Sequence, residues 1–301
     1  MPRVSVVIPV YNCEKYIAAA IDSVLCQTYK DYEIIVVNDG SSDGTNDILL
    51  RYGSKIRVVS QTNSGPAGAR NTGVFNAKGE FIAFLDQDDT WLPQKLSLQV
   101  PLIEANKNVG VVCCDTYIVD SGKFDALVEN CPRSFHMRKP HRGRVFDHLF
   151  FDNFISTSSV IVRKECFSKV GMFDKSVVPI EDFDRWLRIS AFYDMDYVDM
   201  PLVKFRDHVA CFRKNEAVTI RHIIDVLTRI LPEHPEFERA FKEAIADKLS
   251  GLYVTLGKKY LRLKLFNEAL GSFREAFRKK RSFFMIESCI SESLSCFLRF
   301  L

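Results

Sequence analysis

Apolar residues follow two alternating patterns along the first half of the chain. Four short, nearly continuous apolar runs are rich in β-branched residues: RVSVVIPV (3–10), YEIIVVN (32–38), IRVVS (56–60) and FIAFLD (81–86). Such runs are typical of strands that are buried on both faces of a parallel sheet. Between the runs, apolar residues fall at helical spacing, as Ile17, Ile21 and Val24 do. The first half therefore predicts strand–helix–strand units with right-handed crossovers.

Polar turns follow three of these strands and contain the candidate chemistry. The turns are Pro9-Val10-Tyr11, Asn38-Asp39-Gly40 and Leu85-Asp86-Gln87-Asp88. Ligands of parallel sheets bind outside the carboxyl ends of the strands, so we expect the three turns to lie side by side along one edge. Asn12, directly after the first strand, is expected to cap the helix that follows.

Three carboxylates within four positions, Asp86, Asp88 and Asp89, stand out among these polar residues. Asp86 and Asp88 lie on the same side of an extended backbone, because one residue separates them. They can therefore share a hard divalent cation, which can bind a diphosphate and stabilise it as a leaving group. The alternative is that Asp88 and Asp89 only cap a helix that begins near Pro93.

The second half of the chain predicts a different arrangement. Its expected elements are strands at 109–120 and 158–165, a helix at 181–192 with acids in its first turn, and an edge strand at 196–208. After about residue 215 the pattern is helical. We therefore expect an α/β fold, with a mostly parallel central sheet flanked by helices over residues 1–215, followed by an all-α region over 216–301.

Composition narrows the class of protein. The chain has 301 residues, of which 47% are hydrophobic and 26% charged, as in ordinary globular proteins. It has no apolar run of about 18 residues, and its first strand ends too early for a secretory signal peptide. A cytoplasmic location is therefore expected. The nine cysteines are scattered without a CxxC pair, which argues against a disulfide framework or a zinc finger.

The charge is unevenly distributed. Residues 204–301 have a net charge of +7, which leaves −4 for residues 1–203. A basic region of this kind indicates either an anionic partner, such as lipid headgroups at the inner face of the cell membrane, or simply a solvated helical face. Nucleic-acid binding is not expected, because no basic patch with interleaved aromatic residues is present.

Several longer motifs occur in a fixed order over roughly residues 1–210. They are VSVVIPVYN (4–12), QTYKDYEIIVVNDGSSDGT (27–45), NSGPAGARNTG (63–73), FIAFLDQDDTWLPQKL (81–96), SSVIVRKECFSKVGMFD (158–174) and EDFDRWLRIS (181–190). In sequence, order and spacing they resemble the nucleotide-sugar glycosyltransferases of family 2, which have the GT-A fold. That fold is a Rossmann-like, mostly parallel sheet flanked by helices.

The resemblance implies a set of residues that bind the nucleotide sugar. The implied set is Pro9, Tyr11, Asn12, Asp39, Arg70, Asp86, Gln87 and Asp88. Asp39 matches a carboxylate that accepts a hydrogen bond from a ring N–H of the base, and such an acceptor selects uracil, thymine or a guanine edge. Arg70 matches a position near the diphosphate. Asp39 as a turn-forming residue and Arg70 as an ordinary helix-surface arginine are the alternatives.

The resemblance also implies the reaction chemistry. Asp182 matches the general base that deprotonates the acceptor hydroxyl, and Glu181 is the second member of that acidic pair. In-line displacement of the diphosphate by an acceptor hydroxyl, which a carboxylate on the opposite face deprotonates, inverts the anomeric configuration. Asp88, Asp86 and His208 are the implied ligands of a divalent metal, Mn²⁺ or Mg²⁺. Trp91 is a candidate for lining the acceptor cleft. Alternatively, Glu181 and Asp182 are only first-turn acids that interact favourably with the dipole of their helix.

We therefore expect an inverting, metal-dependent transferase that moves a sugar from a nucleoside diphosphate sugar, with UDP as the expected carrier. The expected acceptor is a saccharide or lipid-linked saccharide in cell-surface glycan biosynthesis. The alternatives are a transferase to a lipid phosphate and a non-catalytic nucleotide-sugar-binding or scaffold protein that acts through the helical tail.

The helical tail has a pattern of its own. Tyr253, Leu256, Gly257, Tyr260, Ala269, Phe273 and Ala276 follow the spacing of a tetratricopeptide repeat. One repeat cannot bury both of its faces, so it is expected to pack against neighbouring helices. The tail is then a docking module for a protein partner or a second protomer, or only a helical appendage. The apolar residues of 282–300 also fit contact with a membrane surface.

Overall fold

The computed structural model describes residues 1–124, 131–207 and 216–280. The chain divides into two compact units, unit 1 (residues 1–208) and unit 2 (residues 209–301). The boundary expected from the sequence, between residues 215 and 216, lies at the end of the segment 208–215, outside the described residues.

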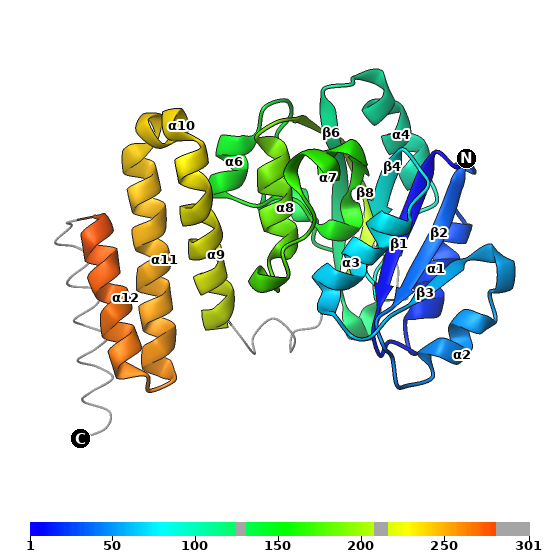
Figure 1. Ribbon diagram of the computed structural model, residues 1–301, viewed down its shortest axis with the longest axis horizontal. Helices are drawn as coiled ribbons and strands as arrows, with labels where there is room; N and C mark the ends of the chain where they lie inside the picture. Colours follow the sequence, from blue (N-terminus) through cyan, green and yellow to red (C-terminus); the bar gives the residue numbers. More distant parts are fainter. Residues whose placement is uncertain (125–130, 208–215, 281–301) are drawn as a thin grey trace. The chain divides into compact units, whose positions relative to one another are not determined.

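Unit 1 contains an eight-stranded mixed sheet (Figure 1). Its strands are β1 (Val4–Val10), β2 (Tyr32–Asn38), β3 (Arg57–Ser60), β4 (Phe81–Phe84), β5 (Thr90–Trp91), β6 (Val109–Asp120), β7 (Ile161–Arg163) and β8 (Asp194–Asp207). The strand order is β3-β2-β1-β4-β7-β6-β8-β5. The pairs β1/β2, β1/β4, β2/β3 and β6/β8 are parallel, and the other three pairs are antiparallel.

The sheet confirms the expected α/β class and corrects one detail. β8 was expected at an edge, but it pairs with β6 on one side and with the short β5 on the other. No strand pattern predicts β5, because only Thr90 and Trp91 form it. A two-residue strand is too short for an alternating pattern to be visible.

Helices flank the sheet of unit 1. They are α1 (Ile17–Leu25), α2 (Thr45–Leu50), α3 (Gly65–Asn76), α4 (Lys95–Ala105), α5 (Ser134–Met137), α6 (Phe146–Phe151), α7 (Glu165–Val170) and α8 (Glu181–Ser190). α3 packs on β1 and β2, and α4 packs on β6 and β8. A Cβ at Gly73 of α3 would lie 2.2 Å from Val7 Cγ1 of β1, so only glycine allows this close approach.

Asn12 does not cap a helix as expected, because α1 begins later, at Ile17. Asn12 instead has a positive φ of 47°, which asparagine tolerates better than most residues. Its side-chain oxygen accepts a hydrogen bond from Ser42 N at 2.8 Å, and its backbone N–H donates to Ser41 Oγ at 3.0 Å. Asn12 thus connects the turn after β1 to the turn after β2.

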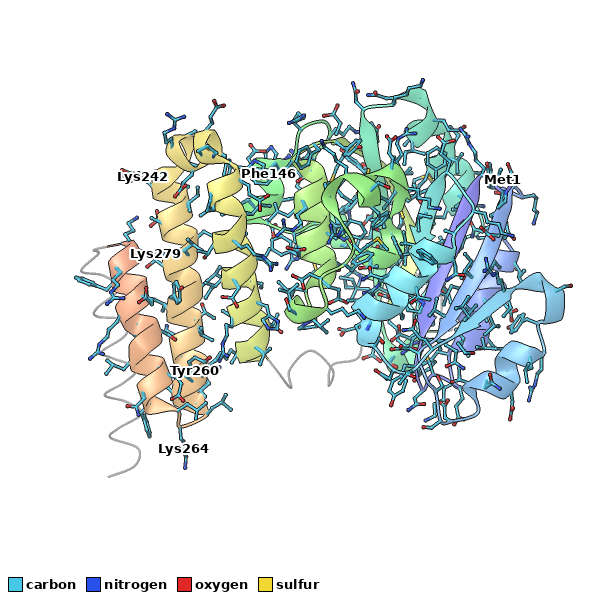
Figure 2. The ribbon with its side chains drawn as sticks, viewed as in Figure 1. Met1, Phe146, Lys242, Tyr260, Lys264 and Lys279 are labelled. Atoms are coloured by element: carbon cyan, nitrogen blue, oxygen red, sulfur yellow. The ribbon has the colours of Figure 1, made fainter. Side chains whose placement is uncertain are left out.

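Unit 2 is helical over its described residues, as expected. Its helices are α9 (Glu216–Ile230), α10 (Pro235–Ala240), α11 (Lys242–Arg262) and α12 (Phe266–Lys279). Ile224, Leu256, Tyr260 and Ala269 form its core, and Figure 2 shows Tyr260 near the turn that bears Lys264. A Cβ at Gly257 would lie 2.4 Å from the ring of Phe273, so α11 and α12 pack closely. The tetratricopeptide assignment stays a prediction. No helix among the described residues is long and apolar enough to cross a membrane.

Candidate active site

The carboxyl ends of β1, β2 and β4 meet at one edge of the sheet, where the topology predicted them. β1 lies between β2 and β4 and is parallel to both. Backbone N–H of Asp39 donates to Val10 O at 2.8 Å, which joins the first two turns. Gln87 Oε1 accepts from Tyr11 N at 2.8 Å, which joins the first turn to the third. Pro9 is buried in β1, whereas Tyr11 is exposed.

Asp39 is buried at this edge, and its carboxylate is held in one orientation. Its Oδ1 accepts from Gln61 Nε2 at 2.6 Å and from Ser64 N at 2.9 Å. Neither bond uses Oδ2, which among the described residues stays available as an acceptor for a ligand donor. The turn itself is closed by Asn38, whose Oδ1 accepts from Ser41 N at 3.0 Å, and not by the carboxylate of Asp39.

Arg70 joins two of the predicted acids. It lies on the buried face of α3 and is only 6% exposed. Its Nη1 donates to Glu181 Oε1 at 2.6 Å, and its Nη2 donates to Asp86 Oδ1 at 2.7 Å. Burial lowers the pKa of Arg70, but Asp86 and Glu181 outweigh burial and raise it above its usual value. The guanidinium is thus a permanent positive charge between the end of β4 and the start of α8, rather than a surface group.

Asp182 and Glu181 begin α8. Asp182 is partly exposed: its Oδ2 accepts from Thr157 Oγ1 at 2.8 Å and its Oδ1 from Phe183 N at 2.7 Å. Burial raises the pKa of Asp182, and Arg70 opposes that rise. The pKa of Glu181 is raised for the same reason and opposed by the same cation. Glu181 Oε2 is buried without a hydrogen-bond partner among the described residues.

The three carboxylates after β4 differ in their surroundings. Asp86 and Asp88 are partly exposed, while Asp89 is 1% exposed. Ser158 Oγ donates to Asp89 Oδ2 at 2.5 Å, and Arg206 N donates to Asp89 Oδ1 at 2.9 Å. Burial, with Asp86 and Asp88 in support, raises the pKa of Asp89 well above its usual value. Asp89 therefore organises the loop, whereas Asp86 and Asp88 keep part of their surface exposed at the edge of the sheet.

The carboxylates suit a hard divalent cation in chemistry, because all their donors are oxygen atoms. No group of three or more His, Cys, Asp or Glu side chains converges as a metal site within residues 1–124, 131–207 and 216–280. His208, the third implied ligand, lies outside these ranges. Of the three residues that the resemblance implied as metal ligands, Asp86 and Asp88 lie within the described ranges, and both are partly exposed.

Trp91 was expected in an acceptor cleft, and the structure contradicts that placement. Its side chain is 3% exposed and belongs to the hydrophobic core. Its Nε1 donates to Ser158 O at 2.8 Å, so its polar atom is also occupied by the fold. The aromatic ring is buried because β5 turns it toward the core between α1 and β8.

Residues that the sequence did not single out complete the site. Thr157 and Ser158 contact Asp182 and Asp89, and Arg206 Nε donates to Asp88 O at 3.1 Å. Lone hydroxyl residues and arginines give no sequence signal of their own, and only the fold brings them to these acids.

A second polar cluster lies on β6. Asp115 is fully buried, and its carboxylate accepts from Arg133 Nε at 2.5 Å, Ser134 Oγ at 2.9 Å and Phe135 N at 2.9 Å. One carboxylate thus fixes the start of α5 against the sheet.

The chain belongs to glycosyl transferase family 2, whose model matches residues 5–171. An uncharacterized glycosyltransferase of Rickettsia typhi, RT0329, is 38% identical over 214 residues. The alignment covers 69% of this chain and 65% of the length of the relative. The Escherichia coli protein WfgD, named UDP-Glc:alpha-D-GlcNAc-diphosphoundecaprenol beta-1,3-glucosyltransferase, is 39% identical over 142 residues, or 42% of this chain and 56% of WfgD.

Two solved structures share the fold. S. aureus TarS 1-349 in complex with UDP aligns with a TM-score of 0.57 and 21% identity, over 92% of this chain and 89% of that TarS chain. The mannosyltransferase PcManGT from Pyrobaculum calidifontis, in complex with GDP-Man and Mn²⁺, aligns with a TM-score of 0.58 and 17% identity, over 98% of this chain and 81% of PcManGT. The fold is thus the GT-A fold that the sequence resemblance implied.

Proposed function

We propose that the protein is an inverting glycosyltransferase that transfers a sugar from a UDP-sugar to a hydroxyl of a saccharide or lipid-linked saccharide. The observation that supports this most strongly is the charge arrangement at the edge of the sheet. Arg70 contacts both Asp86, at the end of β4, and Glu181, which is adjacent to Asp182. Arg70 therefore contacts both an acid that we assign to the donor side, Asp86, and the neighbour of the proposed base, Glu181.

Asp182 is the proposed general base. The acceptor oxygen attacks the anomeric carbon, its proton passes to the Asp182 carboxylate, and the bond to the diphosphate breaks on the opposite face. The raised pKa of Asp182 favours this role, because a base whose pKa is closer to neutral accepts a proton more readily in the transition state. Glu181 is less suited, since its Oε1 already accepts from Arg70 and the group is 3% exposed.

Asp86 and Asp88 are the proposed protein ligands of Mn²⁺ or Mg²⁺. When bound, such a cation neutralises negative charge on the departing diphosphate. Asp89 supports this assignment indirectly: burial is the main cause of its raised pKa, Asp86 and Asp88 raise that pKa further, and a bound cation would relieve their repulsion. His208 stays a candidate third ligand.

Asp39 and Tyr11 are the proposed contacts of the nucleotide base, with Pro9, Asn12 and Gln87 shaping the same turns. Asp39 has an acceptor oxygen to offer to N3–H of uracil. The name of WfgD contains a UDP-linked donor and a lipid-linked saccharide acceptor, and TarS was solved with UDP. A UDP-sugar donor and a lipid-linked saccharide acceptor are therefore the first substrate classes to test.

Two substitutions test the proposal. We expect Asp182→Asn to lower transfer about 10³-fold while UDP binding is retained, because only the base is lost. We expect Asp88→Asn to abolish transfer and to weaken Mn²⁺-dependent UDP binding. Initial rates measure the first effect, and titration calorimetry with UDP in the presence and absence of Mn²⁺ measures the second. Asp47→Asn, an exposed acid on α2, is the matched control.

Three results would contradict the proposal. Unchanged Mn²⁺-dependent UDP binding in Asp88→Asn would exclude the metal role of Asp88. Full transfer by Asp182→Asn would exclude it as the base. Absence of both transfer and UDP-sugar hydrolysis in the unmodified protein, across a panel of donors, would favour a non-catalytic binding protein.

A further inference from the structure

A buried three-residue segment contacts both sides of the site. The 3₁₀ turn Thr157–Ser159 is at most 4% exposed. Thr157 Oγ1 donates to Asp182 Oδ2 at 2.8 Å. Ser158 Oγ accepts from Asp86 N at 3.1 Å and donates to Asp89 Oδ2 at 2.5 Å. Adjacent hydroxyls therefore bind the acceptor-side acid and the donor-side loop.

The Thr157 hydroxyl is well suited to orient a carboxylate. Threonine is β-branched, so its χ1 angle is restricted and its Oγ1 points in a defined direction. Phe183 N donates to the other oxygen of Asp182, so each carboxylate oxygen has one donor and the carboxylate plane is fixed. A hydrogen bond to an ionised acceptor is stronger than one between neutral groups.

The contacts of Ser158 give the turn a second function. Because Asp86 N and Asp89 Oδ2 share one hydroxyl, the loop from Asp86 to Asp89 cannot move without breaking a buried hydrogen bond. Trp91 Nε1 donates to Ser158 O at 2.8 Å, which fixes the backbone of the same turn from the core.

We infer that Thr157 is a positioning residue for Asp182, and that the turn Thr157–Ser158 sets the separation between the base and the loop Asp86–Asp89. This inference rests on the proposed role of Asp182 as the base. A near-attack geometry needs the acceptor oxygen and the anomeric carbon about 3–3.5 Å apart, so a fixed base-to-donor separation contributes directly to rate.

The charged groups that face Asp182 come from three elements. Arg70 of α3 lowers the pKa of Asp182, Asp86 after β4 raises it, and Glu181 is its neighbour on α8. The Thr157 hydroxyl lowers that pKa as well, because it stabilises the ionised form. Loss of the hydroxyl therefore makes the carboxylate harder to ionise.

Thr157→Val is the central test, since valine keeps the shape and removes the donor. We expect kcat to fall about tenfold with little change in KM for the donor. We also expect the acidic limb of the kcat/KM pH profile to move to higher pH, because Asp182 must be ionised to act as a base. Thr157→Ser keeps the hydroxyl and should restore both the rate and the position of the limb.

Ser158→Ala tests the other half of the turn. We expect weaker Mn²⁺-dependent UDP binding by calorimetry, with the acidic limb of the pH profile left in place. If Thr157→Val does not fold, as judged by thermal unfolding, Thr157→Ala replaces it in the same comparison.

The inference is wrong if Thr157→Val and Thr157→Ser have equal rates and equal acidic limbs in their pH profiles. It is also wrong if Thr157→Val lowers the rate but does not move the acidic limb. Failure of the proposed function is recognised separately. In that case Asp182→Asn retains transfer, whatever the Thr157 variants do.

Discussion

Two buried cations of unit 1 lie in opposite surroundings. Arg70, at the edge of the sheet, contacts two carboxylates at 2.6 and 2.7 Å. Lys95, at the start of α4, is fully buried and contacts no carboxylate among the described residues. Its Nζ lies 3.9 Å from the centre of the Trp91 ring and 3.5 Å from Val160 O.

Their pKa values move in opposite directions. Asp86 and Glu181 overcome burial and raise the pKa of Arg70, whereas burial lowers the pKa of Lys95 to about 8. A charge that the fold pairs with acids stays ionised at any working pH. Lys95, whose ammonium group contacts only an aromatic ring and a carbonyl oxygen among the described residues, is close to losing its proton. Burial alone therefore does not identify a functional cation; the groups around it do.

Removal of the paired cation should have the largest effect. We expect Arg70→Met to destabilise unit 1 by about 3–5 kcal/mol, because Glu181 loses the partner of a buried charge. Transfer should fall at least about 100-fold, since Asp86 and Glu181 lose their common contact. Urea unfolding and initial rates measure the two effects. Arg51→Met, an exposed arginine after α2, is the control. Unchanged stability of Arg70→Met would mean that the ion pairs contribute nothing net.

The effect of removing the unpaired cation, Lys95, on the free energy of unfolding should depend on pH. Lys95 has a lower pKa in the folded state than in the unfolded chain, so the folded state binds fewer protons and stability rises with pH between the two values. From about pH 8 to about pH 10, the protein should gain about 2 kcal/mol relative to Lys95→Met. Urea unfolding of both proteins at the two pH values isolates the difference, and transfer should be largely retained. Parallel pH dependences would show that Lys95 titrates normally.

The hydrogen bond of Trp91, whose ring lies against Lys95, gives the smallest effect. Trp91→Phe keeps a ring but removes the N–H that binds Ser158 O. Trp186→Phe is a close control, because Trp186 is also fully buried and its Nε1 has no hydrogen-bond partner among the described residues. We expect Trp91→Phe to cost about 1 kcal/mol more than Trp186→Phe in urea unfolding. An equal cost would show that the hydrogen bond from Trp91 to Ser158 O contributes nothing net to stability.

Much of unit 1 was predictable because its signals are local. The buried runs predicted β1, β2 and β4, and their order along a parallel sheet predicted that Tyr11, Asp39 and Gln87 would gather at one edge. The ion-pair partners of Arg70 were not predictable from the sequence. Arg70 meets Asp86 and Glu181 across 16 and 111 positions of sequence, and no periodicity encodes such pairs.

The errors have physical causes too. Asn12 is a favourable N-cap by residue type, but the chain needs several turn residues before α1, and asparagine is used for its tolerance of a positive φ. Trp91 follows an acidic loop and so suggested a ligand surface. Its two-residue strand instead turns the ring inward, and that depends on β8, more than 100 positions later.

Asp115 has a consequence for engineering this chain. One carboxylate on β6 binds the backbone or side chains of Arg133, Ser134 and Phe135, so the chain returns to a fixed point whatever precedes it. We therefore expect changes of length in the segment before Arg133 to leave the sheet and the start of α5 in place. That segment is suited to grafting loops from relatives, with Asp115 and Arg133 kept constant as the splice point.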